Sequence, residues 1–316
     1  MLAKCSAYRS PTIIYRIEKN IRSKTIFIEG IMEALMKTAD INLRDPFVMP
    51  HNGKYYLYGS RVGVQTGFDV YVSEDLENWR KSGSVFEYKA GFFGTCCFWA
   101  PEVHPYNGRF YMFATFGSQD RHRGTAVLVS DSPEGPFTEY SDGPVTPNDW
   151  ECLDGTLYVS HEGKPYMVFC HEWTQIGDGE VCAVELSEDL RTAVSEPKVL
   201  WKASDAQWVA NICREEDRLG LVTDGPWVMR VGAELICLWS SYDKNGYVEA
   251  VSRSHDGTVM GNWTVDQKIL FGGDGGHGMV FETFKGTYKF VCHMPNTHLL
   301  ERPNFRDITL KDLARS

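Results

Sequence analysis

One hairpin pattern recurs five times along this chain. In each copy a glycine precedes a run of apolar and aromatic residues, and the five glycines are 55, 55, 69 and 54 residues apart: Gly53, Gly108, Gly163, Gly232 and Gly286. Four turn-forming triplets recur between them and would close the outer hairpin of each unit; they begin at Ser73, Ser130, Ser187 and Ser254. Such a period, with about four short strands per unit, is typical of a β-propeller.

We therefore predict an all-β fold, a five-bladed β-propeller over residues 36–316, with the innermost strands lining a central channel. A β-sandwich is the alternative, but it would not explain the recurrent period. A polar or aromatic residue stands eight or nine positions before each hairpin glycine: Asp45, Trp99, Asp154, Asp224 and His277. Because innermost strands meet at the channel, we expect these residues, with Glu102, to share one pocket.

Composition narrows the class of protein. Hydrophobic content of 43% and charged content of 23% are those of a folded soluble protein. The net charge of -10 argues against nucleic acid as a partner and suits a neutral substrate. No apolar run approaches the roughly 18 residues that a membrane span needs. The nine cysteines form no CxxC pair, which favours reduced, buried thiols over a disulfide scaffold.

Residues 1–35 lie outside the repeat and are expected to be an N-terminal extension of uncertain structure. Translation could begin at Met1, or at Met32 or Met36, which closely precede the first hairpin. Scattered charges interrupt this segment, so it lacks the continuous apolar region of a secretory signal. We therefore predict a cytoplasmic protein, and the sequence leaves its oligomeric state open.

Three carboxylates around one pocket, without a nucleophilic Ser or Cys motif or an HExxH motif, suit acid/base hydrolysis of a glycosidic bond. One carboxylate must stay ionised as the base, while another must hold its proton near neutral pH as the acid. A third can raise the pKa of the acid through like-charge repulsion and can orient it.

The motifs around these residues, in this order and spacing, resemble glycoside hydrolase family 43 over about residues 40–300. They are Leu43-Arg44-Asp45-Pro46-Phe47, Phe98-Trp99-Ala100-Pro101-Glu102-Val103, Leu153-Asp154-Gly155-Thr156-Leu157, Thr223-Asp224-Gly225-Pro226-Trp227 and Gly276-His277-Gly278. The resemblance implies a five-bladed propeller with inverting chemistry. It also implies that Asp45 is the general base, that Asp154 tunes and orients the acid, and that Asp224 is the acid.

One motif departs from the family pattern. The family's acid is commonly a Glu in a Glu-Gly-Pro phrase, whereas this chain has Asp224, whose side chain is one methylene shorter. Either the strand lies closer to the glycosidic oxygen, or another residue donates the proton. Glu172 is the alternative acid, because it ends the hairpin that begins at Asp154.

Other residues are candidates for sugar and cation binding. Trp99 and Glu102 offer an aromatic platform and a hydroxyl acceptor, which Phe116, Trp173 and Trp227 could extend. The resemblance implies a structural cation such as Ca²⁺ near His277, with a hydrogen-bonded channel histidine as the alternative. Asp274 could assist either role, and His293 is interpreted as structural. No cofactor is expected to be required for the chemistry.

The combined prediction is an inverting exo-glycosidase of the α-L-arabinofuranosidase or β-xylosidase type, acting on neutral oligosaccharides. A non-catalytic carbohydrate-binding propeller is one alternative. Fructan and sucrose hydrolases, which are retaining propellers, carry an Asn-Asp-Pro-Asn phrase that this chain lacks. A propeller phosphorylase would need a basic phosphate cradle; the basic run 121–123 (Arg121, His122 and Arg123) is interpreted instead as a solvated loop.

Overall fold

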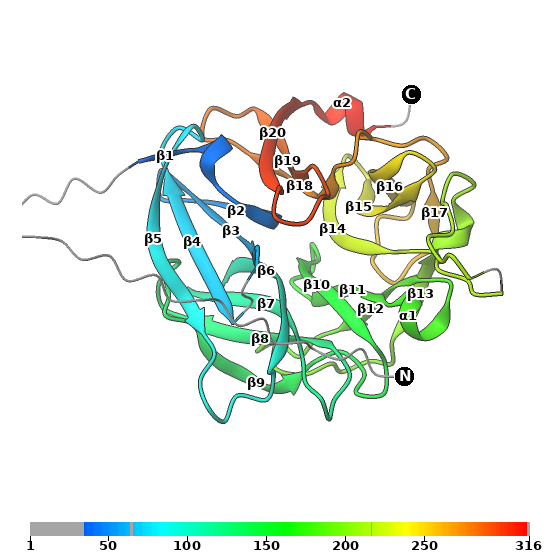
Figure 1. Cartoon of the computed structure of the whole chain (residues 1–316), viewed down its shortest axis with the longest axis horizontal. Coiled ribbons are helices and arrows are strands. Elements are labelled where there is room, and N and C mark those ends of the chain that lie inside the picture. Colours follow the sequence, from blue (N-terminus) through cyan, green and yellow to red (C-terminus); the bar gives the residue numbers. More distant parts are fainter. Residues whose placement is uncertain (1–34, 64–65, 216, 315–316) are drawn as a thin grey trace, which may run out of the picture. The chain divides into compact units, whose positions relative to one another are not determined.

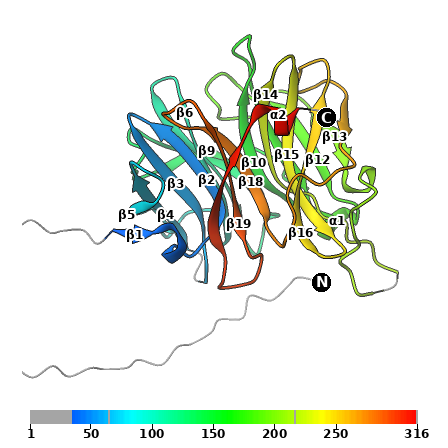
Figure 2. The same cartoon turned by 90° about the horizontal axis from the view of Figure 1, so that it is seen from above.

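A computed structural model describes residues 35–63, 66–215 and 217–314 of the chain. The described residues are almost entirely β-structure, arranged as five antiparallel sheets. Figure 1 shows these sheets placed around a common centre, and Figure 2 shows the same blades from the side. The fold is a five-bladed β-propeller, which confirms the predicted fold class. The expected N-terminal extension and the alternative start at Met32 lie outside the described residues, Leu35 excepted.

The first two blades use the first nine strands. Blade 1 has the order β1-β5-β4-β3-β2, and blade 2 has the order β6-β7-β8-β9. Their strands are β1 Met36–Lys37, β2 Leu43–His51, β3 Lys54–Arg61, β4 Gly67–Ser73, β5 Asn78–Glu87, β6 Cys96–Tyr106, β7 Arg109–Gly117, β8 Gly124–Ser130 and β9 Thr138–Pro144. A short 3-10 helix, η1 Thr38–Asp40, joins β1 to β2.

The remaining three blades follow in chain order. Blades 3 and 4 have four strands each and blade 5 has three, every blade running outward in sequence order. The strands are β10 Cys152–Val159, β11 Pro165–His171, β12 Glu180–Glu185, β13 Lys198–Lys202, β14 Asp224–Val231, β15 Glu234–Asp243, β16 Gly246–Ser254, β17 Trp263–Val265, β18 Gly276–Glu282, β19 Tyr288–Met294 and β20 Arg302–Ile308. Three short helices accompany them: α1 Trp173–Ile176, η2 Ala203–Asp205 and α2 Leu310–Leu313.

Both repeat markers of the sequence are turns of the blades. The five hairpin glycines all adopt positive φ, between 63° and 81°, and lie between the first and second strands of their blades. The Ser-containing triplets lie between the third and fourth strands. In three of the four triplets the serine hydroxyl bonds to the acidic side chain two residues on, as Ser73 does to Asp75 at 3.1 Å and Ser254 to Asp256 at 2.8 Å. The sequence period therefore corresponds to the blade.

The strand count differs from four at the two ends of the described chain. Blade 5 has three strands, and β1 adds a fifth strand to the outer edge of blade 1 through pairing with β5. Blades 5 and 1 meet through polar contacts: the Leu43 amide donates to the Glu301 carbonyl at 3.2 Å. In addition, the Arg44 Nη1 donates to the buried Glu301 Oε1 at 3.1 Å.

The hydrophobic core lies between neighbouring sheets. Central strands such as β8 are buried along their whole length, because each sheet packs against a sheet on either side. That double burial explains the continuous apolar runs after the hairpin glycines. The eight cysteines of the described part are free thiols, five of them buried, in agreement with the prediction. Within the same residues, no helix is long and apolar enough to cross a membrane.

Candidate active site

Each innermost strand carries a β-bulge near its start, and these bulges shape the site. The register of pairing with the second strand shifts at this point in all five blades. In each bulge one residue adopts a left-handed backbone, with φ between 45° and 57°: Asp45, Ala100, Asp154, Gly225 and His277. Bulges commonly redirect a side chain next to an active site. Here they turn the strand heads toward the common centre.

The bulges divide the strand heads into two sets. The five bulge residues named above form one set. The residues immediately before them, which pair with the second strand, form the other: Arg44, Trp99, Leu153, Asp224 and Gly276. The prediction that Asp224 and Trp99 share one register with Asp45, Asp154 and His277 is therefore wrong. Counting back from the hairpin glycine misplaced them by one residue, because the strand and loop lengths differ between blades.

Members of both sets line one central cavity of about 400 Å³. Seven of the predicted site residues line it: Asp45, Trp99, Asp154, Glu172, Trp173, Asp224 and His277. The structure thus brings together side chains that span more than 230 sequence positions. Arg44, Tyr242 and His298 also line the cavity, although the sequence assigned them no role.

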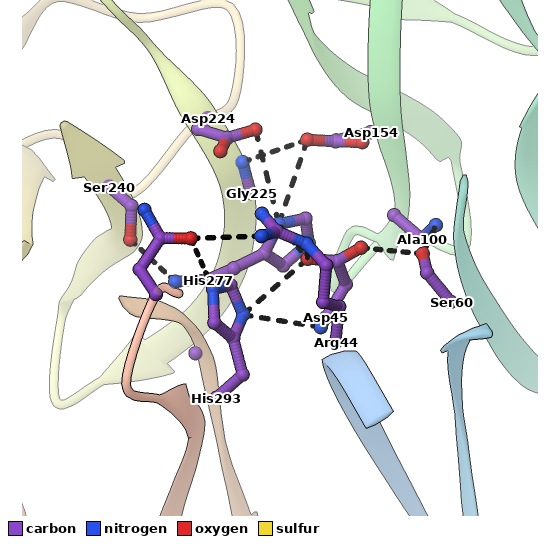
Figure 3. A network of polar contacts seen from close by, with 12 residues as sticks. Arg44, Asp45, Ser60, Ala100, Asp154, Asp224, Gly225, Ser240, His277 and His293 are labelled. Atoms are coloured by element: carbon purple, nitrogen blue, oxygen red, sulfur yellow. Dashed lines mark hydrogen bonds and ion pairs between the residues drawn. The ribbon is translucent and has the colours of Figure 1, made fainter. Parts of the chain in front are cut away.

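Asp45 is buried among cationic and donor groups (Figure 3). Its carboxylate accepts a hydrogen bond from Ser60 Oγ at 2.5 Å and lies 3.7 Å from Arg44 Nε and 3.3 Å from His277 Nδ1. Burial alone would raise the pKa of Asp45, but His277, Arg44, His293 and Ser60 together lower it to about 2. Asp45 is therefore ionised at neutral pH, as a general base requires.

His293 holds the backbone of Asp45. Its Nδ1 accepts the Asp45 amide hydrogen at 3.2 Å, and its Nε2 faces Asn296 Oδ1 at 3.2 Å. This pattern assigns the tautomer with the proton on Nε2. Burial lowers the pKa of His293 to about 4, so the ring is neutral near pH 7. The sequence interpretation of His293 as structural missed this contact, since the two residues are 248 positions apart.

Asp154 has the opposite surroundings. Its Oδ2 accepts the Gly225 amide hydrogen at 3.2 Å, and the same oxygen lies 3.7 Å from His277 Nδ1. Burial and the like charge of Asp224 raise the pKa of Asp154 well above its usual value, and Asp45 adds to the effect. A carboxyl group that resists ionisation beside Asp224 suits the predicted tuning and orienting role.

Asp224 is the most exposed of the three carboxylates, at 21% of its side chain. Its Oδ2 accepts a short hydrogen bond from the Tyr247 hydroxyl, and its Oδ1 lies 3.9 Å from His277 Nδ1. Burial and Asp224 raise the pKa of Tyr247 well above its usual value, so the phenol remains a donor. Tyr247 thus fixes the shorter acidic side chain at the cavity wall.

His277 lies at the centre of the three carboxylates. Its Nδ1 is within 3.9 Å of an oxygen from each of Asp45, Asp154 and Asp224. The ring also packs against Gly225: a Cβ at that glycine would lie 2.6 Å from His277 Cγ. Glycine is therefore required at position 225, both for its φ of 49° and for this close approach.

Glu172, the alternative acid, lines the same cavity but is held by an arginine. Arg123 Nη2 forms a short ion pair with Glu172 Oε2, which also accepts from Thr174 Oγ1 at 2.5 Å. Burial raises the pKa of Glu172, although Arg123 opposes that shift. The interpretation of the basic run 121–123 as a solvated loop is wrong for Arg123, whose guanidinium also bonds to Glu151 and lies over the Trp99 ring.

Three predicted sugar-binding residues lie elsewhere. Phe116 is fully buried in an aromatic cluster, with its ring 5.2 Å from that of Phe98. Trp227 packs against two core clusters between the blades. Glu102 is paired with His104 Nε2 at 3.0 Å and lines a separate cavity of about 10 Å³. The structure therefore does not place these three residues in the wall of the main cavity, and their contact with sugar stays a prediction.

Two of the three carboxylates also form a candidate cation site. Asp154, Asp224 and His277 each offer one ligand atom, and these atoms lie within 4.8 Å of one another. Carboxylate oxygens suit a hard ion such as Ca²⁺, whereas an imidazole nitrogen does not. Asp224 and Asp154 are also the predicted acid and the carboxyl that orients it. Asp274, which was expected to assist a cation site, does not line this cavity. The predicted calcium near His277 therefore stays a prediction.

The fold and site together define a class: five-bladed propellers whose strand-head carboxylates converge on a central cavity. Within that class, the family model "Glycosyl hydrolases family 43" matches residues 39–312. The chain belongs to this family, which confirms the resemblance that the motifs predicted.

Solved structures and curated proteins agree with this assignment. The crystal structure of an endo-arabinase from Bacteroides thetaiotaomicron VPI-5482 superposes with a TM-score of 0.82 and 40% identity, covering 87% of this chain and 96% of that chain. An extracellular endo-α-(1→5)-L-arabinanase 1 from Bacillus subtilis (strain 168) is 26% identical over 147 residues, 42% of this chain and 45% of that protein. An α-L-arabinofuranosidase 43 from Humicola insolens is 21% identical over 238 residues, 72% and 47% respectively. The chain thus spans less than half the length of these two curated relatives.

Proposed function

We propose that this protein is a glycoside hydrolase that cleaves arabinofuranosyl or xylosyl linkages of neutral oligosaccharides with inversion. The observation that carries the proposal is the opposite electrostatic setting of two bulge carboxylates in one cavity. Asp45 is held ionised, while Asp154 is held toward its protonated form beside Asp224. Acid/base hydrolysis needs such a separation between its groups. The arabinanase and arabinofuranosidase named among the relatives support the sugar class.

In this mechanism Asp45 and Asp224 act from two sides of the bound sugar. Asp45 accepts a proton from water, whose oxygen forms the new bond to the anomeric carbon. The glycosidic carbon–oxygen bond breaks at the same time, and Asp224 delivers its proton to the departing oxygen. Asp154 adjoins this acid and orients it, and the repulsion that two adjacent carboxylate charges would cause keeps one proton on the pair. No step requires a cofactor.

Asp224 is a better acid candidate than Glu172 because of their partners. Asp224 adjoins Asp154, which can share a proton with it, and the Tyr247 hydroxyl fixes the orientation of its carboxyl group. Glu172 is bound to the permanent charge of Arg123, which occupies its carboxylate and opposes the rise that burial gives its pKa. The ion pair suits a role in shaping the cavity wall beside Trp99.

The substrate is tested by a panel of 4-nitrophenyl α-L-arabinofuranoside, β-D-xyloside and β-D-galactoside, together with linear α-1,5-arabino-oligosaccharides. We expect turnover of the arabinofuranosyl substrates, and none by the Asp45→Ala variant. Sugar binding without turnover of any substrate would instead indicate a binding module. The sizes of the first products separate the predicted exo action from endo action.

The stereochemical course has its own test. Proton NMR during early turnover identifies the anomer that forms first, before mutarotation. Inversion is the expected result, because the proposal makes the ionised Asp45 a base that activates water and not a nucleophile. Net retention would overturn the proposed mechanism.

The proposal also includes a structural calcium ion near His277 and a cytoplasmic location. If calcium binds near His277, its role is structural, so turnover should survive treatment with a chelator. A loss of turnover that added Ca²⁺ restores would contradict this. The predicted cytoplasmic location is tested by cell fractionation, and the oligomeric state by light scattering.

A further inference from the structure

Side-chain hydrogen bonds connect four of the five blades to the bulge of the next one and form an interrupted ring. Ser60 Oγ of blade 1 accepts the Ala100 amide hydrogen of blade 2 at 2.7 Å. Thr115 Oγ1 of blade 2 accepts that of Asp154 in blade 3 at 2.9 Å. The ring thus supports the left-handed bulge backbone that points each strand head into the cavity.

The same contact recurs at the far side of the ring. Ser240 Oγ of blade 4 accepts the His277 amide hydrogen of blade 5 at 2.7 Å. His293 of blade 5 closes the ring by accepting the Asp45 amide hydrogen at 3.2 Å. Figure 3 shows the contacts of Ser60, Ser240 and His293.

The acceptors occupy one equivalent position on the second strand of each blade. Each is paired with the residue just before the bulge of its own blade: Ser60 with Arg44, Thr115 with Trp99, Ser240 with Asp224 and His293 with Gly276. In blade 3 the equivalent residue is Cys170, which pairs with Leu153. Cys170 is fully buried and is the one thiol in this ring.

The hydrogen-bond pattern is interrupted at Cys170. The amide that Cys170 would be expected to bind is that of Gly225 in blade 4. In the described structure this amide donates instead to Asp154 Oδ2, at 3.2 Å. A thiol is a weak hydrogen-bond acceptor, so it competes poorly with a carboxylate for the amide.

Blade 1 shows what a hydroxyl does at this position. Ser60 Oγ binds two groups at once: it accepts from the next blade's bulge amide and donates to Asp45 Oδ2, the bulge carboxylate of its own blade, at 2.5 Å. Ser240 likewise accepts from His277 and donates to Glu249 at 2.7 Å. A hydroxyl at position 170 could therefore bind both Gly225 and Asp154.

We propose that Cys170 contributes to the placement of the acid side of the site by lacking a hydroxyl, a property that alanine would share. By withholding a hydroxyl from this junction, it leaves the Gly225 amide to Asp154, and that bond holds the Asp154 carboxyl beside Asp224. The inference rests on the proposed hydrolase function. It goes beyond that function by assigning a role to a buried side chain that does not line the cavity.

The test compares Cys170→Ser with Cys170→Ala. Serine replaces sulfur by oxygen and supplies the competing hydroxyl, whereas alanine supplies none and serves as the matched control. Each variant is assayed on two arabinofuranosides, one with a 2,4-dinitrophenyl leaving group and one with a sugar leaving group. The dinitrophenolate leaves without protonation, so only the second substrate depends on the acid.

For Cys170→Ser we expect kcat/KM on the sugar leaving group to fall about tenfold relative to the dinitrophenyl substrate, a partial loss of acid catalysis. For Cys170→Ala we expect the ratio to stay within about twofold of the wild type. Because the two rates are compared within one preparation, the ratio is independent of the amount of folded enzyme. An unchanged ratio in Cys170→Ser, or an equal fall in Cys170→Ala, would overturn the proposal.

Failure of the function itself would look different. A wild-type protein inactive on both substrates would refute the proposed hydrolysis. If the wild type is active and the Cys170 variants keep its ratio of kcat/KM values, only the positioning role is refuted. Cys170→Thr supplies the same hydroxyl and should reproduce the fall seen with serine.

Discussion

Blades 1 and 3 carry an aspartate at the same β-bulge position, but the pKa values of the two aspartates shift in opposite directions. Asp45 and Asp154 both occupy a bulge, with φ of 51° and 57°, and both are buried. Yet the pKa of Asp45 falls to about 2, while that of Asp154 rises well above its usual value. Burial pushes both values upward. The neighbouring groups therefore decide which carboxylate remains ionised.

Those neighbours differ at equivalent positions. The residue before the bulge is Arg44 in blade 1 but Leu153 in blade 3. The second-strand partner is Ser60 in blade 1 but Cys170 in blade 3. A charge and a hydroxyl thus favour the ionised form in one blade, and both are missing at the matching positions of the other.

Removing the ionised carboxylate should have the largest effect. Asp45→Ala is expected to lower kcat/KM by about 10³–10⁴-fold on every substrate, since no residue replaces the base. Added azide should then restore turnover and yield a glycosyl azide, because the small anion can attack in place of activated water. The base would lie elsewhere if Asp45→Ala kept the wild-type rate, or if azide restored turnover to a variant of another carboxylate and not to Asp45→Ala.

The identity of the acid is decided by leaving-group dependence. Asp224→Asn should lower kcat/KM by about 10²–10³-fold for a sugar leaving group and far less for dinitrophenolate. Glu172→Gln is the matched variant, and we expect it to reduce both rates by a similar factor. The reverse pattern would make Glu172 the acid.

Making blade 1 resemble blade 3 should move the pH profile. The double variant Arg44→Leu/Glu301→Gln removes the cation beside Asp45 without leaving the buried Glu301 unpaired. Because Arg44 lowers the pKa of Asp45, its loss should shift the acidic limb of kcat/KM to higher pH. Glu301→Gln alone is the control, and an unmoved limb in the double variant would show that Arg44 is unimportant for the base.

The smallest effect concerns stability. The pKa of Asp154 is raised in the folded state, so its contribution to stability is fully present below its unfolded pKa of about 3.9 and is lost as pH rises through the folded value. Asp154→Asn removes that loss while keeping the Gly225 bond possible. We expect the melting temperature to rise by about 2–5 °C at pH 8, with little change at pH 4. Turnover should fall in the same variant.

Much of the architecture could be read from the sequence. The hairpin glycines and Ser-containing turns are local signals, because each fixes a backbone conformation with residues a few positions away. Their period therefore predicted five blades, and their distance to the strand heads predicted five of the fourteen residues that line the cavity. The strand heads were located only to within one residue, since a bulge changes the register without changing composition.

The sequence by itself determined the blades, the family and the three carboxylates, because these depend on local turn chemistry and on short motifs. Only the tertiary structure decided how the carboxylates differ. Arg44, His293, Tyr247 and Cys170 act across strands and blades, and His293 meets Asp45 from 248 positions away. Protonation depends on charges and hydrogen bonds within a few ångströms, and those distances exist only once the propeller has closed.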